Sequence, residues 1–183
     1  ICAVDSEIGL MQPIKEIGEI VKDYPKCYFH VDCTQAIGKI DVDFTNIDMA
    51  SFSAHKFFGL KGIGVLVKKE NIMIEPLIHG GKSTTIFRSG TPPLPLIVSL
   101  MKALDLIHVN ISDNYKYVSE LNKALIDGLK QYKNIHINST NNSLCYIINF
   151  SIHGIKPETL VHALEEYNIF ISTKSACSST NTI

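Results

Sequence analysis

Two polar clusters stand directly after apolar segments of the chain. Asp32 follows one apolar run, and Ser53, His55 and Lys56 follow another. Open α/β sheets place their ligands at the carboxyl ends of the strands. A lysine at such a place can form a Schiff base, and pyridoxal phosphate needs a lysine, a carboxylate for its pyridine nitrogen and donors for its phosphate. These residue types and their spacing favour pyridoxal phosphate chemistry.

Each of these residues also has an ordinary interpretation. An aspartate at a strand end is commonly a turn or helix-cap residue. A lysine at a strand end is commonly a solvated charge. The chemical interpretation therefore depends on the residues occurring together and in order along the chain.

Three segments of the chain resemble cysteine desulfurases, a family of the class V, fold-type I aminotransferase superfamily. They are 30–35 (His-Val-Asp-Cys-Thr-Gln), 51–56 (Ser-Phe-Ser-Ala-His-Lys) and 88–91 (Arg-Ser-Gly-Thr). Shorter matches occur at 7–9, 61–64, 79–81 and 175–178, so the resemblance runs through essentially the whole chain.

The resemblance implies a homodimeric enzyme that converts L-cysteine to L-alanine. The sulfur leaves as a cysteine persulfide for an acceptor protein, a scaffold or thiolase, in iron-sulfur cluster assembly or tRNA thiolation. By the same resemblance, Lys56 holds pyridoxal 5'-phosphate and moves protons, Asp32 pairs with the pyridine nitrogen, and Gln35 bonds the phenolic oxygen. The cofactor-binding positions it implies are Ser6, Asp32, Gln35, Ser53, Ala54, His55, Lys56 and Thr91, where Ser53 and His55 bind the phosphate and Thr91 reaches across from the other subunit.

Cys177 is the expected catalytic nucleophile. It lies in the small, polar segment 172–182, which predicts an exposed thiol on a mobile arm. The other cysteines have strand-like or apolar neighbours and are expected to be buried structural thiols: Cys2, Cys27, Cys33 and Cys145. Because the five cysteines form no C-x-x-C pair and show no metal-ligand spacing, we expect neither a disulfide framework nor a metal site.

Two positions depart from the family pattern. The family usually has Asn where this chain has Ser6, a shorter group with a different donor set, which bears on substrate positioning. The family tends to have Gly where this chain has Lys174, which we expect to stiffen the arm and lower the pKa of the Cys177 thiol.

The elements that must position these residues follow from hydrophobic periodicity. In the first half, apolar runs predict strands at 1–4, 27–32, 47–52 and 63–67, with a helix that starts at Pro13 and stops at 23–25. This alternation predicts an α/β layer covered on both faces. With the resemblance, it is part of the large domain of a pyridoxal phosphate-dependent transferase, with a mixed, mainly parallel sheet.

The second half predicts a small α+β domain at the C-terminal side. Prolines at 92, 93 and 95 interrupt the chain, which puts a boundary near 92–110 and suggests domains at 1–95 and 96–183. The expected elements are helices over 97–107 and 118–129, strands at 135–137 and 144–150, a helix at 157–167 and a strand at 169–172.

The amino-acid composition indicates which kinds of partner the protein can bind and in which cellular compartment we expect it. The 183 residues carry 17 Lys and Arg against 18 Asp and Glu, which leaves no basic footprint for nucleic acid or an anionic membrane. No long apolar run or signal-peptide pattern is evident, so we expect a cytoplasmic protein. A start without Met, inside a strand-like segment, suggests a piece of a longer enzyme that is inactive alone.

Two alternatives stay open at this stage. One is a related pyridoxal phosphate-dependent lyase or aminotransferase in which Cys177 is incidental. The other is a desulfurase-like domain that acts as a sulfur-relay scaffold without making persulfide itself. The Ser-Ala-Cys tripeptide ending at Cys177 favours the desulfurase.

Overall fold

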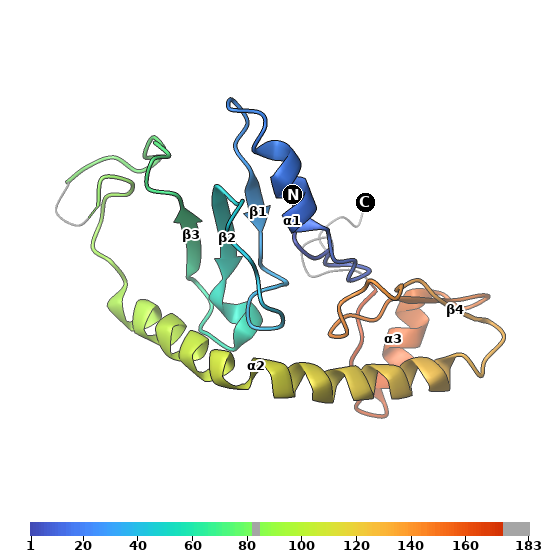
Figure 1. Cartoon of the computed structure of the whole chain (residues 1–183). Helices are drawn as coiled ribbons and strands as arrows, with labels where there is room; N and C mark the ends of the chain where they lie inside the picture. Colours follow the sequence, from blue (N-terminus) through green and yellow to red (C-terminus); the bar gives the residue numbers. More distant parts are fainter. Residues whose placement is uncertain (82–84, 174–183) are drawn as a thin grey trace. The chain divides into compact units, whose positions relative to one another are not determined.

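The computed structural model describes residues 1–81 and 85–173 (Figure 1). The chain forms two compact units. Among the described residues, the first contains Ile1–Ala3 and Pro13–Asp113, and the second contains Val4–Gln12 and residues 114–173. The division at residue 95 that the prolines suggest remains a prediction about the domains of the complete enzyme.

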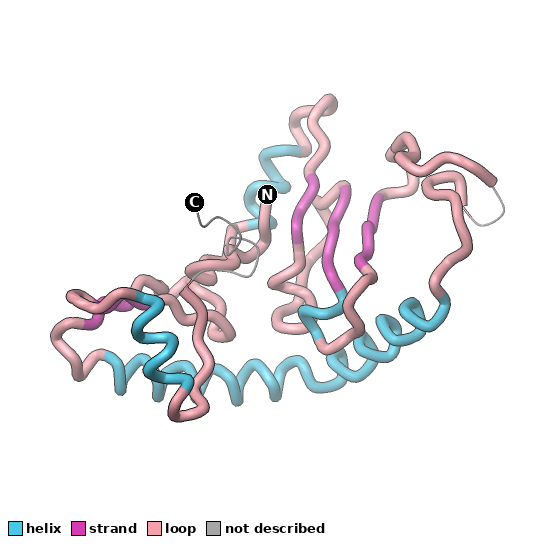
Figure 2. The backbone as a smooth tube through the Cα atoms, turned by 180° about the vertical axis from the view of Figure 1, so that it is seen from behind, coloured by secondary structure: helices cyan, strands magenta, loops and turns pink. Residues whose placement is uncertain are grey.

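The first unit is built on a three-stranded mixed sheet. Its strands are β1 (His30–Asp32), β2 (Met49–Ser53) and β3 (Gly64–Lys68), in the order β1-β2-β3. β1 and β2 are parallel, whereas β2 and β3 are antiparallel. Figure 2 shows from behind how these strands lie side by side. The sequence predicts a mixed sheet within an α/β domain, and the observed sheet is mixed.

The strands are shorter than the apolar runs that predict them. The run 27–32 contributes only its last three residues to β1. The run 1–4 contributes a single parallel bridge from Cys2 to Asp32, with the Ala3 amide donating to the Asp32 carbonyl at 2.8 Å. A strand exists only where its backbone finds a hydrogen-bonded neighbour, and apolar sequence alone does not supply one.

Alternating side chains make the core of the first unit. Ala50 and Phe52 of β2 are buried while their neighbours are half-buried, as the two-residue period of a strand requires. Val31 of β1 is fully buried, and the rings of Phe52 and Phe57 pack with centroids 6.0 Å apart.

Helix α1 (Ile14–Val21) is present as predicted and begins one residue after Pro13, which is its N-cap. Gly18 is its buried residue, and a Cβ at this position would meet the Cβ of Asn46 at 2.6 Å. A glycine therefore allows the helix to approach the loop before β2 closely.

One continuous helix, α2 (Leu94–Leu129), replaces the two helices predicted over 97–107 and 118–129. The prediction of two helices is wrong because residues 108–117 contain no glycine or proline to end the helix. Leu100, Ala103 and Ile107 are buried. By length and composition alone α2 could cross a membrane, with mean hydropathy 1.6 over 18 residues. A single helix of this kind is weak evidence for a membrane span, and 17% of its 18-residue window is buried.

The second unit pairs β4 (Ile135–Ile137) with β5 (Phe150–Ile152) in an antiparallel sheet and adds α3 (Pro157–Glu165). The strand predicted at 144–150 starts only at Phe150, because the Ile147 amide closes a turn onto the Leu144 carbonyl at 3.0 Å. The strand predicted at 169–172 is not present, since this segment pairs with no other described strand.

Candidate active site

The predicted residues of the first unit lie at the ends of two parallel strands. Asp32 ends β1 and is paired in register with Ser51 of β2, and Ser53 ends β2 two residues later. Parallel strands end at the same edge of a sheet, so Asp32 and the residues after Ser53 share one edge. The register thus places a half-buried carboxylate beside the segment that carries Lys56.

Asp32 combines a local turn with a free acceptor. Its Oδ1 accepts a hydrogen bond from the Thr34 amide at 2.9 Å, which is the turn role expected of an aspartate at a strand end. Among the described residues nothing donates a hydrogen bond to Oδ2. Oδ1 therefore stabilises the local turn, and Oδ2 remains able to accept a hydrogen bond from another group.

A 3-10 turn, η1 (Ala54–Phe57), carries the lysine. It starts directly after Ser53, whose hydroxyl makes no capping bond to it. Ala54 and Phe57 are buried, His55 is exposed and Lys56 is half-buried. The apolar ends of the turn thus anchor it in the core, while the two polar side chains between them face outward from it.

Close packing of glycine holds this turn. A Cβ at Gly59 would meet the Cβ of Ala54 at 2.8 Å and its carbonyl oxygen at 3.0 Å. The Gly59 amide donates to that carbonyl at 2.9 Å, and Phe58 takes a left-handed conformation with φ 69°. The return of the chain after Lys56 therefore depends on a residue without a side chain.

Gln35 lies in a turn of residues 33–40 that follows β1. The Cys33 amide donates to the Ser51 carbonyl at 2.8 Å, and the Ile37 amide donates to the Cys33 carbonyl at 3.0 Å. These bonds attach the turn to the end of β2. Gln35 itself is half-buried and accepts a hydrogen bond at Oε1 from Lys39 Nζ, at 3.5 Å.

Lys39 is a member of this cluster that the sequence analysis missed. Its Nζ also donates to the main-chain oxygen of Lys56, at 3.4 Å. Burial, and then the charge of Lys56, lower the pKa of Lys39 to about 8. The spacing of Gln35 and Lys39, four residues apart in a helical turn, is the signal that points to their contact.

The four described cysteines differ in burial more than the sequence predicts. Cys33 is fully buried, and burial followed by the Asp32 charge raises its pKa to about 11. Cys145 is half-buried, with its Sγ donating to the Tyr115 carbonyl at 3.9 Å. The expectation of burial is wrong for Cys2 and Cys27, which are exposed because the segments around them form no buried strand. Cys177 and Lys174 lie outside the described residues.

Thr91 and the glycines before it occupy a separate loop. The Ser89 amide donates to the Ile78 carbonyl at 3.1 Å, and Gly80 has a positive φ of 149°. Thr91 is exposed. Its predicted role across a subunit interface stays a prediction.

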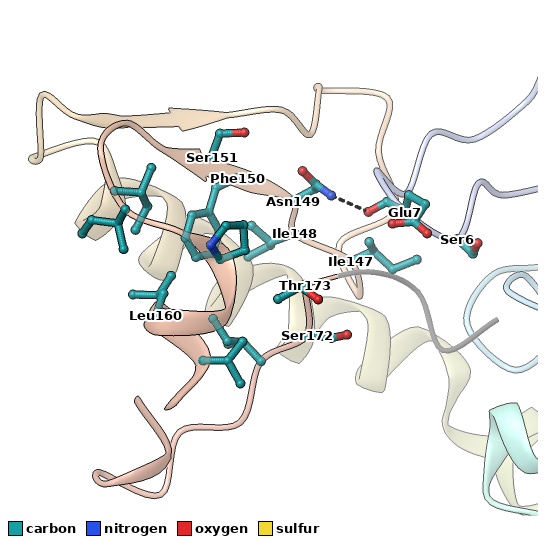
Figure 3. A pocket seen from close by; sticks show the side chains of 15 residues that line it. Ser6, Glu7, Ile147, Ile148, Asn149, Phe150, Ser151, Leu160, Ser172 and Thr173 are labelled. Carbon is teal, nitrogen blue, oxygen red and sulfur yellow. Dashed lines mark hydrogen bonds between the residues drawn. The ribbon is translucent and has the colours of Figure 1, made fainter. Parts of the chain in front are cut away.

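Ser6 belongs to the second unit and lines a pocket of about 610 Å³ there (Figure 3). Asn149 Nδ2 donates to the Glu7 carbonyl at 3.1 Å, which joins the segment 4–12 to the residue before β5. Asp5 Oδ1 accepts the amides of Glu7 and Ile8 at 2.9 and 2.8 Å. Polar and apolar side chains both line the pocket: its lining residues are Ser6, Glu7, 147–152, Ile155, Pro157, Leu160, Val161 and 171–173.

The end of this α/β sheet therefore presents a carboxylate, an amide and a lysine on a tight turn, the residue types that the sequence motifs predict there. The chain belongs to the aminotransferase class-V family, whose description matches residues 1–182. This confirms the superfamily expected from the motifs.

Cysteine desulfurases are among its relatives. The chain is 44% identical over 184 residues to the NifS/IcsS protein homolog of Lactobacillus delbrueckii subsp. bulgaricus, covering 98% of this chain and 48% of the relative. It is 39% identical over 180 residues to the cysteine desulfurase IscS of Methanosarcina thermophila, covering 97% and 44%. The chain thus spans about half the length of the curated relatives it matches.

Solved structures confirm the fold. A NifS-like protein superposes with a TM-score of 0.90 at 36% identity, over 96% of this chain and 49% of the other. A second structure, of SspA in complex with cysteine, gives a TM-score of 0.74 at 31% identity, over 98% of this chain and 50% of the other. The predicted α/β architecture of such enzymes is therefore correct.

Proposed function

We propose that the protein to which this chain belongs is a pyridoxal phosphate-dependent cysteine desulfurase, a sulfurtransferase that converts L-cysteine to L-alanine. The proposal rests on one observation. The parallel strands β1 and β2 end on the same side of the sheet, so Asp32 and the turn that carries Lys56 lie at that same side. Relatives named cysteine desulfurase, and a similar structure titled as a complex with cysteine, support the same substrate.

The side chains at the edge fit pyridoxal phosphate by their chemistry. Lys56 is the amine that would hold the cofactor aldehyde, and its Nζ would move protons at the substrate. Asp32 Oδ2, which lacks a donor among the described residues, suits a protonated pyridine nitrogen. Gln35 has an amide for the phenolic oxygen, and bound pyridoxal phosphate supplies the electron sink that the reaction needs.

Two more groups suit the phosphate. The Ser53 hydroxyl makes no capping bond to η1, and His55 next to it is exposed. Both can donate hydrogen bonds to an anion. Ala54 between them is buried and its amide donates to the Ile63 carbonyl at 3.3 Å, so this residue anchors the turn.

Sulfur transfer is assigned to Cys177. In the proposed step a thiolate of Cys177 forms a bond to the sulfur of L-cysteine while the Cβ–S bond of the substrate breaks. The electron pair stays on the substrate carbon, which takes up a proton to give alanine. No external oxidant is needed, and the product on the enzyme is a persulfide.

The finer expectations about partners and place belong to the same proposal. We propose a homodimer in which Thr91 serves the partner's site, and an acceptor protein that takes the persulfide sulfur for iron-sulfur cluster or tRNA thiolation pathways. The four described cysteines are free thiols, which suits a reducing compartment such as the cytoplasm.

The first test is attachment of the cofactor at Lys56. The purified protein with pyridoxal phosphate is treated with borohydride, digested and mapped by mass spectrometry. We expect the label on Lys56, and its loss together with the visible absorbance in Lys56→Ala. The exposed Lys61 provides a matched control, since Lys61→Ala should keep both. Label on another lysine contradicts the assignment.

The second test is the reaction itself. Adding L-cysteine should change the visible absorbance and release equal amounts of alanine and, with a thiol reductant, sulfide. A related lyase or aminotransferase would instead release a keto acid or act equally well on other amino acids. A relay scaffold would bind a partner but leave L-cysteine unchanged.

A further inference from the structure

Lys39 forms hydrogen bonds to two separate turns, each of which carries a proposed cofactor residue. Its Nζ lies 3.5 Å from Gln35 Oε1 in its own turn and 3.4 Å from the main-chain oxygen of Lys56 in η1. Both hydrogen bonds are long, but they converge on one half-buried amine. One side chain thus contacts the residue predicted to bond the phenolic oxygen and the residue predicted to hold the cofactor.

The chemistry of lysine decides how the Gln35 amide must point. An ammonium group has three donors and no acceptor, so only the oxygen of the amide can face it. The two ends of a glutamine amide are otherwise nearly equivalent in shape and can exchange places. With Oε1 held by Lys39, the Nε2 donors of Gln35 face away from Lys39, where an acceptor oxygen can receive them.

The second hydrogen bond of Lys39 goes to a carbonyl near the end of η1. The last carbonyl groups of a helical turn lack partners within the turn. Lys39 supplies a donor to the carbonyl of Lys56, beside the Gly59 amide that already bonds the Ala54 carbonyl. The amine therefore restrains the backbone from which the Lys56 side chain extends.

We propose that Lys39 is a positioning residue of the site, which orients the Gln35 amide as a donor and ties the 33–40 turn to the Lys56 turn. This inference rests on the proposed function, because the acceptor for Gln35 Nε2 is the phenolic oxygen of bound pyridoxal phosphate. It assigns to Lys39 no contact with cofactor or substrate.

The surroundings of Lys39 support this role. Its acceptors among the described residues are neutral oxygens, and burial together with the Lys56 charge lowers its pKa to about 8. A cation held in such a place is unfavourable compared with an exposed lysine. A hydrogen-bonding role for the amine accounts for a lysine at this position better than solubility does.

The first test needs no cofactor. The rate at which acetic anhydride labels each lysine is followed against pH by mass spectrometry, in the wild type and in Gln35→Leu. We expect the labelling midpoint of Lys39 to fall in Gln35→Leu, because an acceptor that stabilises the ammonium is lost, while the exposed Lys26 serves as an unchanged control. An unchanged Lys39 midpoint overturns the proposal.

The second test is a double-mutant cycle on cofactor binding. The variants are Lys39→Met, Gln35→Leu and both together, with Lys26→Met as the matched control. Each single change at the site should weaken binding of pyridoxal phosphate roughly twofold to tenfold and shift the pH midpoint of its visible absorbance. Because Lys39 acts in part through Gln35, the double variant should bind more tightly than the product of the two single effects predicts.

Other outcomes have a defined meaning. If the two changes multiply, Lys39 acts independently of Gln35 and the proposal fails. Lys39→Arg, which keeps donors and charge, should recover most of the affinity, and it also serves if Lys39→Met does not fold. If the wild-type protein of the relatives' length takes up no pyridoxal phosphate, the proposed function fails, and the labelling experiment still decides whether Lys39 bonds Gln35.

Discussion

At the scale of single residues, the described cysteines differ in how deeply each thiol is buried. Cys33 sits beside Asp32 in the candidate site, yet it is fully buried and its pKa is raised to about 11. A thiol with that pKa is almost wholly protonated at neutral pH and is a poor nucleophile. Proximity to the cofactor residues therefore does not make Cys33 the sulfur acceptor.

The first prediction contrasts two cysteines. Cys177→Ser should abolish alanine and sulfide formation but leave the absorbance of bound pyridoxal phosphate intact, because the thiol is needed only after substrate has bound. Cys33→Ala should keep turnover within a few-fold and cost roughly 1 to 2 kcal/mol in unfolding free energy, from a small cavity. Equal loss of turnover in both variants would reassign the nucleophile.

The second prediction concerns the pH dependence of stability. The pKa of Lys39 is about 8 in the folded chain, against an ordinary 10.5. Between these values the unfolded state binds more protons than the folded state, so the contribution of Lys39 to stability rises with pH. Below pH 8 both states are protonated, and the unfavourable burial of the charge is fully present.

The measurement is the difference between wild type and Lys39→Met in urea unfolding at pH 7 and pH 10. We expect the stability of the wild type relative to the variant to increase between the two pH values, while titration of the other groups is common to both proteins. A difference that stays constant or decreases as the pH rises would show that the lysine is not buried as a cation.

At the scale of elements, the turn η1 depends on the close contact of Gly59 with Ala54. A Cβ on Gly59 would lie 2.8 Å from the Ala54 Cβ and 3.0 Å from its carbonyl oxygen, so backbone must move. The third prediction is that Gly59→Ala loses roughly 1 to 3 kcal/mol of unfolding free energy and much of the pyridoxal phosphate affinity. The turn carrying Lys56 would be displaced.

Gly128 near the end of α2 is the matched control. A Cβ there meets nothing within 4 Å, and alanine is favoured over glycine in a helix, so Gly128→Ala should be neutral or slightly stabilising. Urea unfolding and a cofactor titration follow both variants. If Gly59→Ala behaves like Gly128→Ala, the close packing does not hold the turn.

The sequence predicted β1, β2, β3, α1 and α3 and the residues at the strand ends, because periodicity and motifs are local. It did not predict that α2 is continuous, since apolar stripes at 97–107 and 118–129 look alike with or without a break. It also missed Lys39, whose contact with Lys56 joins residues 17 apart in sequence and depends on how two turns pack. Tertiary contacts of this kind leave no periodic signal.

At the scale of the whole molecule, these 183 residues leave large apolar side chains exposed in the first unit. Leu66 and Val67 of β3 are 50% and 42% exposed, and Val98 and Met101 of α2 are 55% and 58% exposed. β3 is also an edge of the described sheet, with an unpaired row of backbone donors and acceptors. Exposed apolar surface and open strand edges favour association with other protein chains.

The last prediction compares a protein of only these 183 residues with one of the relatives' length, about twice as long. The short protein should self-associate over a wide range of sizes in light scattering, bind pyridoxal phosphate weakly and release almost no alanine from L-cysteine. Each hydrogen bond to the cofactor that only the longer protein makes is worth about 1 to 3 kcal/mol, so lacking several lowers the affinity by orders of magnitude. The longer protein should be a uniform dimer that turns over. A monodisperse 183-residue protein with comparable turnover would show that the described residues already make a complete site, and that the exposed faces of β3 and α2 need no cover.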